Sequence, residues 1–363
     1  MKILHLEAST GWGGQEIRIL REAIGMRERG HIVHFAVNLG AKLGEHAKKE
    51  GFSVLYLSFA KKNWLSCLFK LLILIRRNQI ELLNTHSSLD AWIGGIAARI
   101  TGKSIVRTRH LSTPIRKGLN SKLLYHKLTD YVVTTCKAIA PVIIEQSGKP
   151  SHLCKSIPTG VEVSDITYPQ DEPKQFREQM GISDDDFLVG MVCFMRSWKG
   201  VDDFIEAANL TRDVPNLKWV IIGGGHTRDY LPKVDQLDLH KTLKFSGHLT
   251  KPFGAIASLN AFCLLSTAHE GVSQASLQAA FLEKPLITTP IGGLPEVCID
   301  KKTGYIVPPF APKEVADKVL KLKGSPAEAS EMGKNARKLV LNQFTFPKTL
   351  EEMEKAYITA SNL

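Results

Sequence analysis

The chain has 363 residues, of which 44% are hydrophobic, and this length and apolar content predict two ordinary domain cores. The six cysteines form no Cys-x-x-Cys pair, so we expect reduced core thiols in a cytoplasmic protein rather than a disulfide scaffold. The first residues, MKILHL, are strand-like and too short and polar for a signal peptide.

The formal net charge of +11 is unevenly distributed. Residues 1–155 hold 24 Lys/Arg against 10 Asp/Glu, a net of +14, whereas the remainder holds 23 against 26, a net of −3. Such asymmetry indicates an anionic partner for the first half, which could be a membrane surface, a phosphorylated acceptor or nucleic acid. A solvated basic surface without a partner is the alternative.

In the first half, short apolar runs of strand length alternate with helical stretches, a pattern that predicts a parallel α/β sheet. Strands are expected over residues 2–6, 32–37, 54–57, 82–85, 104–107 and 131–134.

A glycine-rich turn, Gly11-Trp12-Gly13-Gly14, follows the first expected strand and precedes a helical stretch over 15–29. Its G-x-G-G spacing differs from G-x-G-x-x-G, and the second strand offers no convincing ribose-binding acid, which argues against a dehydrogenase. A tight turn without a ligand is the alternative to a phosphate-binding turn.

The most apolar helical run, WLSCLFKLLILI over residues 64–75, is flanked by pairs of basic residues. At twelve residues it is too short to span a bilayer. We favour a core helix of the first domain; the alternative is a helix in the membrane interface with its basic ends on anionic lipid.

Two histidines, His86 and His110, each follow a strand of the first half. A lone histidine is more often a structural polar residue than a catalytic one, so each becomes a candidate only in a wider context.

A second series of strands is expected over 186–194, 219–222, 243–245, 261–265 and 286–288. The boundary between the two series is expected near residues 157–161, IPTGV, where a Pro/Gly pair follows a short strand. The sequence therefore predicts domains over 1–157 and 158–344, followed by a C-terminal segment over 345–363.

The loops after these strands carry cations and glycines. Arg196 and Lys199 follow the strand over 186–194, and an Arg fork beside a Lys point charge suits a diphosphate. Gly224 and Gly247 lie in the loops after the next two strands, each a weak signal alone.

The stretch over 266–296, STAHEGVSQASLQAAFLEKPLITTPIGGLPE, is the most informative. It lies in the order strand, acidic turn, helix over 273–282 with Ser273 as N-cap, strand and Gly-Gly turn, which predicts a βαβ unit. Glu270 and the amides of Gly271, Val272 and Ser273 are then expected together at the carboxyl end of the sheet. A carboxylate accepts from hydroxyls and helix N-terminal amides donate to anions, so this combination suits a phosphorylated sugar.

The same stretch resembles the donor-site signature of family 4 glycosyltransferases, in Glu270-Gly271 and in the GGLPE turn over 292–296. The family's second Glu, eight positions after the first, usually binds the nucleotide ribose. Here that position is Gln278, which can hydrogen-bond hydroxyls without the charge.

The resemblance implies a GT-B fold, with two Rossmann-like domains facing a central cleft. It also implies a C-terminal helix crossing back to the first domain, for which residues 345–360 are the candidate. It assigns acceptor binding to residues 1–157 and nucleotide-sugar binding to 158–344. It implies reaction with retention, in which the leaving diphosphate oxygen deprotonates the acceptor hydroxyl, without a metal ion or other cofactor. Catalytic roles follow for Glu270, His110, Lys199 and Arg196. Donor-binding roles follow for Gly13, Gly14, His86, Gly224, Gly247, Gly271, Val272, Ser273 and Gln278.

The sequence thus predicts a retaining glycosyltransferase that moves a sugar from a nucleotide-diphosphate donor to a cell-envelope glycolipid or polysaccharide precursor. We expect it in the cytoplasm, peripheral at the inner face of the cytoplasmic membrane, with an anionic membrane surface but not nucleic acid as partner. The alternatives are a GT-B sugar-nucleotide epimerase or hydrolase, and a noncatalytic nucleotide-sugar-binding or nucleic-acid-binding protein.

Overall fold

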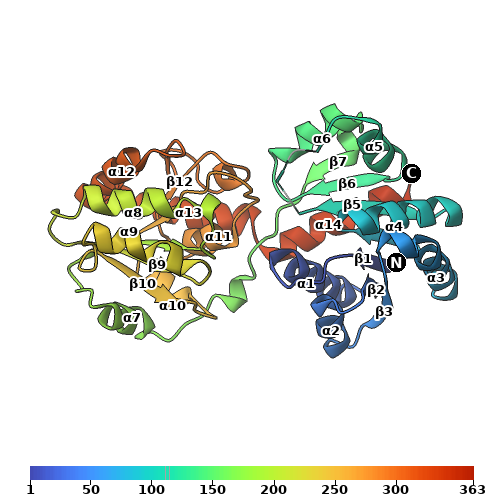
Figure 1. The fold of residues 1–363 in the computed structure, drawn as a ribbon, viewed down its shortest axis with the longest axis horizontal. Coiled ribbons are helices and arrows are strands. Elements are labelled where there is room, and N and C mark those ends of the chain that lie inside the picture. The colour runs from blue at the N-terminus through green and yellow to red at the C-terminus, as the bar shows by residue number, and fades with distance from the viewer. Residues whose placement is uncertain (111, 114) are drawn as a thin grey trace. The chain divides into compact units, whose positions relative to one another are not determined.

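A computed structural model describes residues 1–110, 112–113 and 115–363 (Figure 1). The chain forms two compact units: unit 1 comprises Met1–Thr159 with Pro347–Leu363, and unit 2 comprises Gly160–Phe346. Each unit contains one parallel sheet flanked by helices, so the predicted α/β fold of two Rossmann-like units is confirmed.

The sheet of unit 1 has the strand order β3-β2-β1-β4-β5-β6-β7 in the described part of the chain, with every pair parallel. The strands are β1 (Lys2–Glu7), β2 (Ile32–Asn38), β3 (Ser53–Leu57), β4 (Leu82–Thr85), β5 (Ser104–Arg109), β6 (Tyr131–Thr134) and β7 (Cys154–Ser156). Each run expected in the first half is a strand, and β7 is the short strand expected before residue 157.

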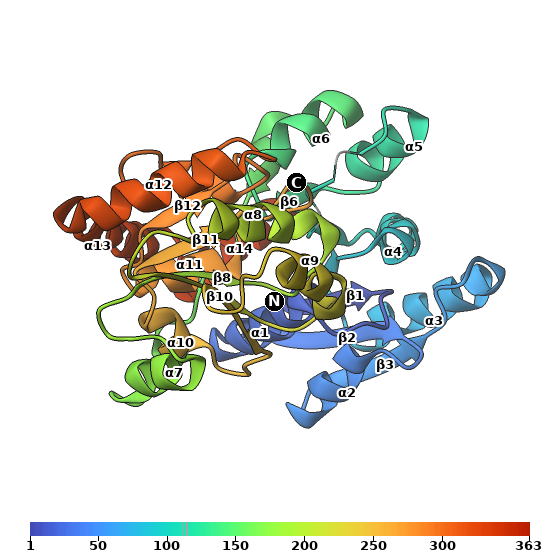
Figure 2. The ribbon, with the colours of Figure 1, turned by 60° about the vertical axis from the view of Figure 1, so that its left-hand side comes forward.

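The helices of unit 1 follow from the strand order, because right-handed crossovers in opposite directions lie on opposite faces of a sheet. Helices α1 and α2 therefore cover one face, while α3 and α4 pack together on the other (Figure 2). The helices are α1 (Gly14–Glu28), α2 (Lys42–Lys49), α3 (Trp64–Arg77), α4 (Ser88–Thr101), α5 (Leu119–Ser121), a π-helical turn (Lys122–Lys127), α6 (Ile139–Ser147) and α14 (Phe346–Ser361).

Helix α14 joins unit 1 although it lies at the end of the chain, beside α1 in Figure 1. The buried Tyr357 hydroxyl donates to Glu22 Oε1 and accepts from Asn84 Nδ2 at 2.8 Å. Burial raises the pKa of Glu22, and Arg18 Nε lies 3.8 Å from its Oε2. The returning C-terminal helix predicted from the sequence is thus confirmed, and buried polar contacts fix its position.

The sheet of unit 2 has the order β10-β9-β8-β11-β12-β13 in the part of the chain described, again wholly parallel. The strands are β8 (Phe187–Val192), β9 (Leu217–Ile222), β10 (Leu243–Gly247), β11 (Ala261–Leu264), β12 (Leu286–Thr288) and β13 (Gly304–Ile306). The first was expected to reach residue 194 but ends at Val192, because the chain there turns into the loop that carries Arg196. The sequence analysis did not predict β13.

The helices of unit 2 cover both faces of its sheet. They are α7 (Glu172–Met180), α8 (Val201–Leu210), α9 (Leu231–Gln236), α10 (Phe253–Ala257), α11 (Gln274–Phe281), α12 (Pro312–Gly324) and α13 (Pro326–Gln343). Helix α12 packs on α8, and α13 packs on α11 (Figure 2). Between α8 and the sheet, the buried rings of Phe204 and Trp219 meet edge to face at 4.9 Å.

The cysteines are all free thiols, and five of the six are buried, as expected for core residues. Over the residues described, no helix is both long enough and apolar enough to cross a membrane.

Replacing Tyr357 by Phe should lower the free energy of unfolding by about 1–3 kcal/mol, because buried Asn84 and Glu22 groups lose a hydrogen-bond partner. Urea denaturation measures this. The control is Tyr56→Phe on β3, where the ring stays beneath the Lys48 ammonium, 4.6 Å from its centroid. Equal stability of both variants and wild type would show that the Tyr357 hydroxyl does not help to hold α14.

Candidate functional site at the carboxyl edges of the sheets

Glu270 lies in the loop after β11, at the carboxyl edge of the unit 2 sheet, and is only 5% exposed. Lys199 Nζ donates to its Oε1, and Ser266 Oγ donates to the same oxygen at 2.6 Å. Lys199 follows β8, which is the neighbour of β11 in the sheet, so parallel pairing brings the two residues together. A nearly buried carboxylate is therefore held by an ammonium and a hydroxyl.

The Gly-Gly turn explains how the Glu270 loop is supported. A Cβ atom at Gly292 would lie 1.7 Å from the Glu270 carbonyl oxygen, and one at Gly293 would lie 2.6 Å from the Val272 nitrogen. Gly292 also has a positive φ of 58°, and Gly293 N donates to the Glu270 carbonyl at 3.3 Å. The turn after β12 thus needs two glycines because it lies directly against the backbone of residues 270–272.

Helix α11 begins where the sequence predicts. The Ser273 side chain caps it by accepting from Ser276 N at 3.3 Å. Val272 is buried, while Gly271, Ser273 and Gln278 are half-buried. The structure therefore places Glu270, Gly271, Val272 and Ser273 consecutively at one edge, with Gln278 one turn further along the helix.

The loop with Lys199 lies on the end of β11. A Cβ at Gly200, whose φ is 71°, would lie 2.0 Å from the Leu265 carbonyl oxygen, and Thr267 N donates to Trp198 O at 2.8 Å. These contacts hold the backbone of Lys199 next to the strand that leads to Glu270.

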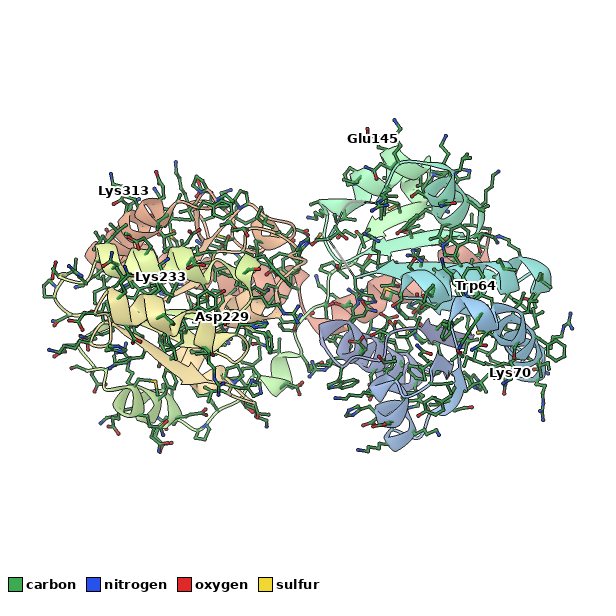
Figure 3. The ribbon with its side chains drawn as sticks, in the orientation of Figure 1. Trp64, Lys70, Glu145, Asp229, Lys233 and Lys313 are labelled. Atoms are coloured by element: carbon green, nitrogen blue, oxygen red, sulfur yellow. The ribbon has the colours of Figure 1, made fainter. Side chains whose placement is uncertain are left out.

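Arg196, in the same loop, has different neighbours from Lys199. Its exposed guanidinium lies 5.1 Å from the Phe194 ring centroid and 5.2 Å from that of Trp198. These three side chains help to line a cavity of about 670 Å³, whose wall also includes His226 and Asp229, the latter labelled in Figure 3. The structure thus separates the two cations that the sequence analysis grouped together.

Gly224 lies in the loop after β9, whereas Gly247 is the last residue of β10 and not, as the sequence analysis expected, part of the loop after it. Met195 N donates to Gly224 O at 2.8 Å, and Gly223 N donates to Gly247 O at 2.9 Å. Backbone hydrogen bonds therefore tie the loops after β8 and β9 to each other and to the end of β10.

In unit 1 the glycine-rich turn contains its own carboxylate. Glu16 accepts from Gly13 N at 2.9 Å and from Ser9 Oγ at 2.7 Å. An acidic side chain in the first turn stabilises a helix start, and here it engages the Gly13 amide that we expected to face a phosphate. Gly14 is exposed at the first residue of α1.

His86 and His110 are brought together at the carboxyl edge of the unit 1 sheet. His86 Nδ1 lies 3.0 Å from His110 Nε2, and His86 Nε2 lies 2.9 Å from Nδ1 of the buried His5. Burial lowers the pKa of His86 and of His110 well below the usual value, and it lowers the pKa of His5 to about 3. The three imidazoles are therefore neutral near pH 7.

Two acids near this edge were missed by the sequence analysis. Glu7, at the end of β1, accepts from Ser9 N at 2.7 Å and from Ser87 Oγ. Burial and then the charge of Asp90 raise the pKa of Glu7 to about 7, and burial raises the pKa of Asp90 to about 6. A possible signal was the polar alternation of His5 and Glu7 in an otherwise apolar first strand. Among the side chains described, no cluster of three or more His, Cys, Asp or Glu could hold a metal ion.

The comparisons with known proteins identify the family and the fold of the chain. Residues 12–165 match the model of Glycosyltransferase Family 4, and residues 172–339 match that of Glycosyl transferases group 1. The chain is 25% identical over 375 aligned residues to the capsular polysaccharide biosynthesis glycosyltransferase CapM of Staphylococcus aureus, covering 99% of this chain and 97% of that protein.

Solved structures share the fold along the whole chain. A glycosyltransferase from Rickettsia africae superposes with a TM-score of 0.90 at 18% identity, covering 99% of this chain and 98% of that one. HepE from Anabaena in complex with UDP superposes with a TM-score of 0.86 at 19% identity, covering all of both chains. The two family models together span nearly the whole chain, and the chain belongs to the family 4 glycosyltransferases, retaining enzymes of the GT-B fold that use nucleotide-sugar donors.

Proposed function

We propose that the donor's diphosphate and sugar bind at the carboxyl edge of the unit 2 sheet, where Lys199 and Glu270 contact each other. The observation that carries this proposal is the direct contact of the two side chains at that edge. Lys199 donates to the diphosphate, while Glu270 accepts from sugar hydroxyls. Gly271, Val272 and Ser273 contribute backbone amides of the turn that leads into α11. Gln278 hydrogen-bonds the ribose without a charge. HepE, which has the same fold, is solved with UDP, and this supports a nucleoside diphosphate as ligand.

In the proposed reaction the bond between the anomeric carbon and the diphosphate oxygen breaks, and the acceptor hydroxyl oxygen bonds to the same face of that carbon. The proton of the hydroxyl passes to the departing diphosphate oxygen. The protein then contributes mainly by positioning and by stabilising the charge that grows on the diphosphate. Lys199 is the cation best placed to stabilise the charge on the diphosphate, because Arg196 lies between aromatic rings at the neighbouring cavity. We assign Arg196, Gly224 and Gly247 a supporting role at the nucleotide.

In unit 1, His86, His110, Gly13 and Gly14 are assigned to the donor and the acceptor on the strength of the family resemblance. His110 acts on the substrate. Both ring nitrogens of the buried His86 are engaged by His5 and His110, so His86 positions His110 and does not itself bind the donor, contrary to the expectation from the sequence. Gly14, as the exposed first residue of α1, is better suited than Gly13 to meet a phosphate, because the Gly13 amide already donates to Glu16.

The acceptor that we propose is a cell-envelope glycolipid or polysaccharide precursor, reached from the inner face of the cytoplasmic membrane. The net charge of +14 over residues 1–155 favours an anionic acceptor or surface. CapM, similar over nearly its whole length, is named for capsular polysaccharide biosynthesis, which agrees with an envelope acceptor.

Helix α3 provides the surface for membrane contact. One stripe, Cys67, Leu71 and Ile75, is buried, as expected for a core helix. The opposite side leaves Leu65, Phe69 and Ile73 86%, 65% and 40% exposed, which favours the membrane-interface alternative of the sequence analysis for this side of the helix.

The charged residues that flank this apolar stripe in the sequence are all basic. Five cations occur in the stretch, at 61, 62, 70, 76 and 77, and no acidic residue lies between Glu50 and Glu81. Lys70 and Arg77 border a groove of about 410 Å³ whose apolar wall is Leu55, Ile73 and Leu74. Trp64 and Lys70, labelled in Figure 3, mark this helix. Exposed apolar side chains between cations suit an anionic lipid surface.

Replacing Glu270 by Ala or Gln should reduce sugar transfer by about a hundredfold or more, because one preorganised group at the reacting sugar is lost. The Gln variant keeps the shape of the side chain and can still accept from Ser266 Oγ. A loss of transfer in this variant would therefore be due to the missing charge. The measurement is product formation from a panel of nucleotide sugars, with product analysis to separate transfer from epimerisation or hydrolysis. Glu283→Gln, beyond the far end of α11 and paired only at the surface with Arg337, is the matched control. Near wild-type transfer by both Glu270 variants would remove this residue from the donor site.

Replacing Lys199 by Ala should weaken nucleoside diphosphate binding by about 10- to 100-fold, the value of a charge-assisted hydrogen bond. Arg196→Ala should have a smaller effect. Isothermal titration with UDP, GDP and ADP measures both, and Lys313→Ala, an exposed substitution on α12, serves as the control. Unchanged affinity of Lys199→Ala for the tightest of the three nucleotides would contradict the assignment.

The protein should bind vesicles with anionic lipid more tightly than neutral ones, and the binding should weaken as salt shortens the Debye length from about 10 Å at 0.1 M to about 3 Å at 1 M. Each Lys or Arg near the surface contributes about 1 kcal/mol. Changing Lys61, Lys62, Arg76 and Arg77 to Gln should therefore release the protein in flotation assays while leaving nucleotide binding intact.

A matched control removes four exposed lysines of unit 1 that lie outside α3, at 42, 49, 117 and 127. It should float with the vesicles more than the α3 variant does. Phe69→Ser should also weaken flotation without a change of charge. Two results would overturn the role of α3. One is equal partitioning of the wild type on neutral and anionic vesicles, and the other is a loss of flotation in the control variant as large as that in the α3 variant.

A further inference from the structure

Three histidines of unit 1 form a continuous hydrogen-bonded chain. His5 Nδ1 lies 2.9 Å from His86 Nε2, and His86 Nδ1 lies 3.0 Å from His110 Nε2. The His5 and His86 rings are within 7° of parallel. His5 is fully buried and His86 is 4% exposed, whereas His110 is half-buried. The chain therefore runs from the core below β1 to the edge of the sheet after β5.

The protonation of this chain is restricted. A neutral imidazole has one N–H and one bare nitrogen, and each hydrogen bond between two rings needs one of each. Burial lowers the pKa of all three rings, and the nearby cations Arg18 of α1 and Arg107 of β5 lower those of His86 and His110 further. With all rings neutral, only two arrangements satisfy both bonds: every ring protonated at Nδ1, or every ring protonated at Nε2.

The two arrangements differ at the ends of the chain. In the first, Nε2 of His5 is bare and Nδ1 of His110 carries a hydrogen. In the second, Nε2 of His5 carries a hydrogen and Nδ1 of His110 is bare. His5 Nε2 is buried and has no hydrogen-bond partner in the described structure, and on its ring face His5 stacks on Phe35 with the centroids 5.6 Å apart. Buried donors without partners are rarer in proteins than under-satisfied acceptors, which favours the first arrangement.

We propose that His110 acts on the substrate as a hydrogen-bond donor through Nδ1, and that the chain through His86 to His5 holds it in this tautomer. His110 then stabilises an oxygen of the donor sugar or phosphate and does not remove the proton of the acceptor hydroxyl. His5 and His86 are positioning residues in this scheme. The identification of His110 with the substrate rests on the proposed function, whereas its tautomer does not.

Nitrogen NMR tests the tautomer without any activity. In protein labelled with ¹⁵N at the rings of its 12 histidines, long-range ¹H–¹⁵N spectra distinguish a protonated nitrogen from a bare one. Loss of signals in His5→Phe, His86→Phe and His110→Phe assigns the rings. We expect Nδ1–H and bare Nε2 for all three between pH 6 and 8. Protonated Nε2 in His110, or different tautomers in His86 and His110, would overturn the proposal.

Kinetics test the donor role with a matched pair. The side-chain amide nitrogen of Asn can take the place of Nδ1–H, whereas the isosteric Asp offers only acceptors. His110→Asn should retain at least tenfold more kcat than His110→Asp and His110→Ala, at similar KM for the nucleotide sugar. Thermal melting and the remaining histidine signals show that each variant is folded. If His110→Asp is at least as active as His110→Asn, residue 110 acts as a base, which would contradict the proposal. If wild type transfers no sugar, the proposed function fails, while the NMR result still decides the tautomer.

Discussion

Parallel strand pairing is the constraint on which both units depend. A parallel sheet aligns the carboxyl ends of its strands, so loops far apart in sequence meet at one edge. In unit 2 this brings Lys199, after β8, to Glu270, after β11, across 71 positions of sequence. In unit 1 the same geometry joins His86, after β4, to His110, after β5. In each sheet the strand order also reverses beside the first strand, between β1 and β4 and between β8 and β11, and open parallel sheets generally bind their ligands at such a reversal.

The contact between Lys199 and Glu270 is the centre of the donor site that we propose in unit 2. Two charges at a site where Glu270 is 5% exposed are costly to remove from water, and each depends on the other for compensation. A nucleotide sugar can replace each partner with one of its own, because its diphosphate is an anion for Lys199 and its hydroxyls are donors for Glu270. On this view the ion pair keeps both side chains oriented at the edge and is exchanged for contacts with the donor. The glycines at 200, 292 and 293 serve this arrangement by letting the supporting backbones approach within distances that a Cβ would block.

The sequence correctly predicts the features that depend on neighbouring residues. Short apolar runs located the strands except β7, expected only as a short strand before residue 157, and β13, whose three residues, Gly304–Ile306, are too short for a pattern. The capping serine of α11 and the Gly-Gly turn were found because each depends on neighbouring residues. Contacts between distant segments were not found. The sequence placed Arg196 with Lys199, but the loop directs Arg196 to the rings of Phe194 and Trp198. The run over 64–75 was assigned to the core because apolar residues occur on all sides of it. Only the packing of α3 against α4 shows which of them remain exposed.

The polar interior of unit 1 links its fold to its edge. Arg18 and Glu22 on α1 are fully buried, and they hold the C-terminal helix through Tyr357 and the segment before unit 2 through the Ile157 carbonyl at 2.8 Å. Arg18 is also one of the charges that disfavour protonation of His86 and His110. A cation needed to anchor α14 therefore helps to keep the imidazoles at the edge neutral. Because the polar network is buried, changing one member leaves others unsatisfied. The attachment of the last helix and the neutral state of the histidines thus share one buried arginine, which contacts Glu22 on one side and disfavours protonation of the imidazoles on the other.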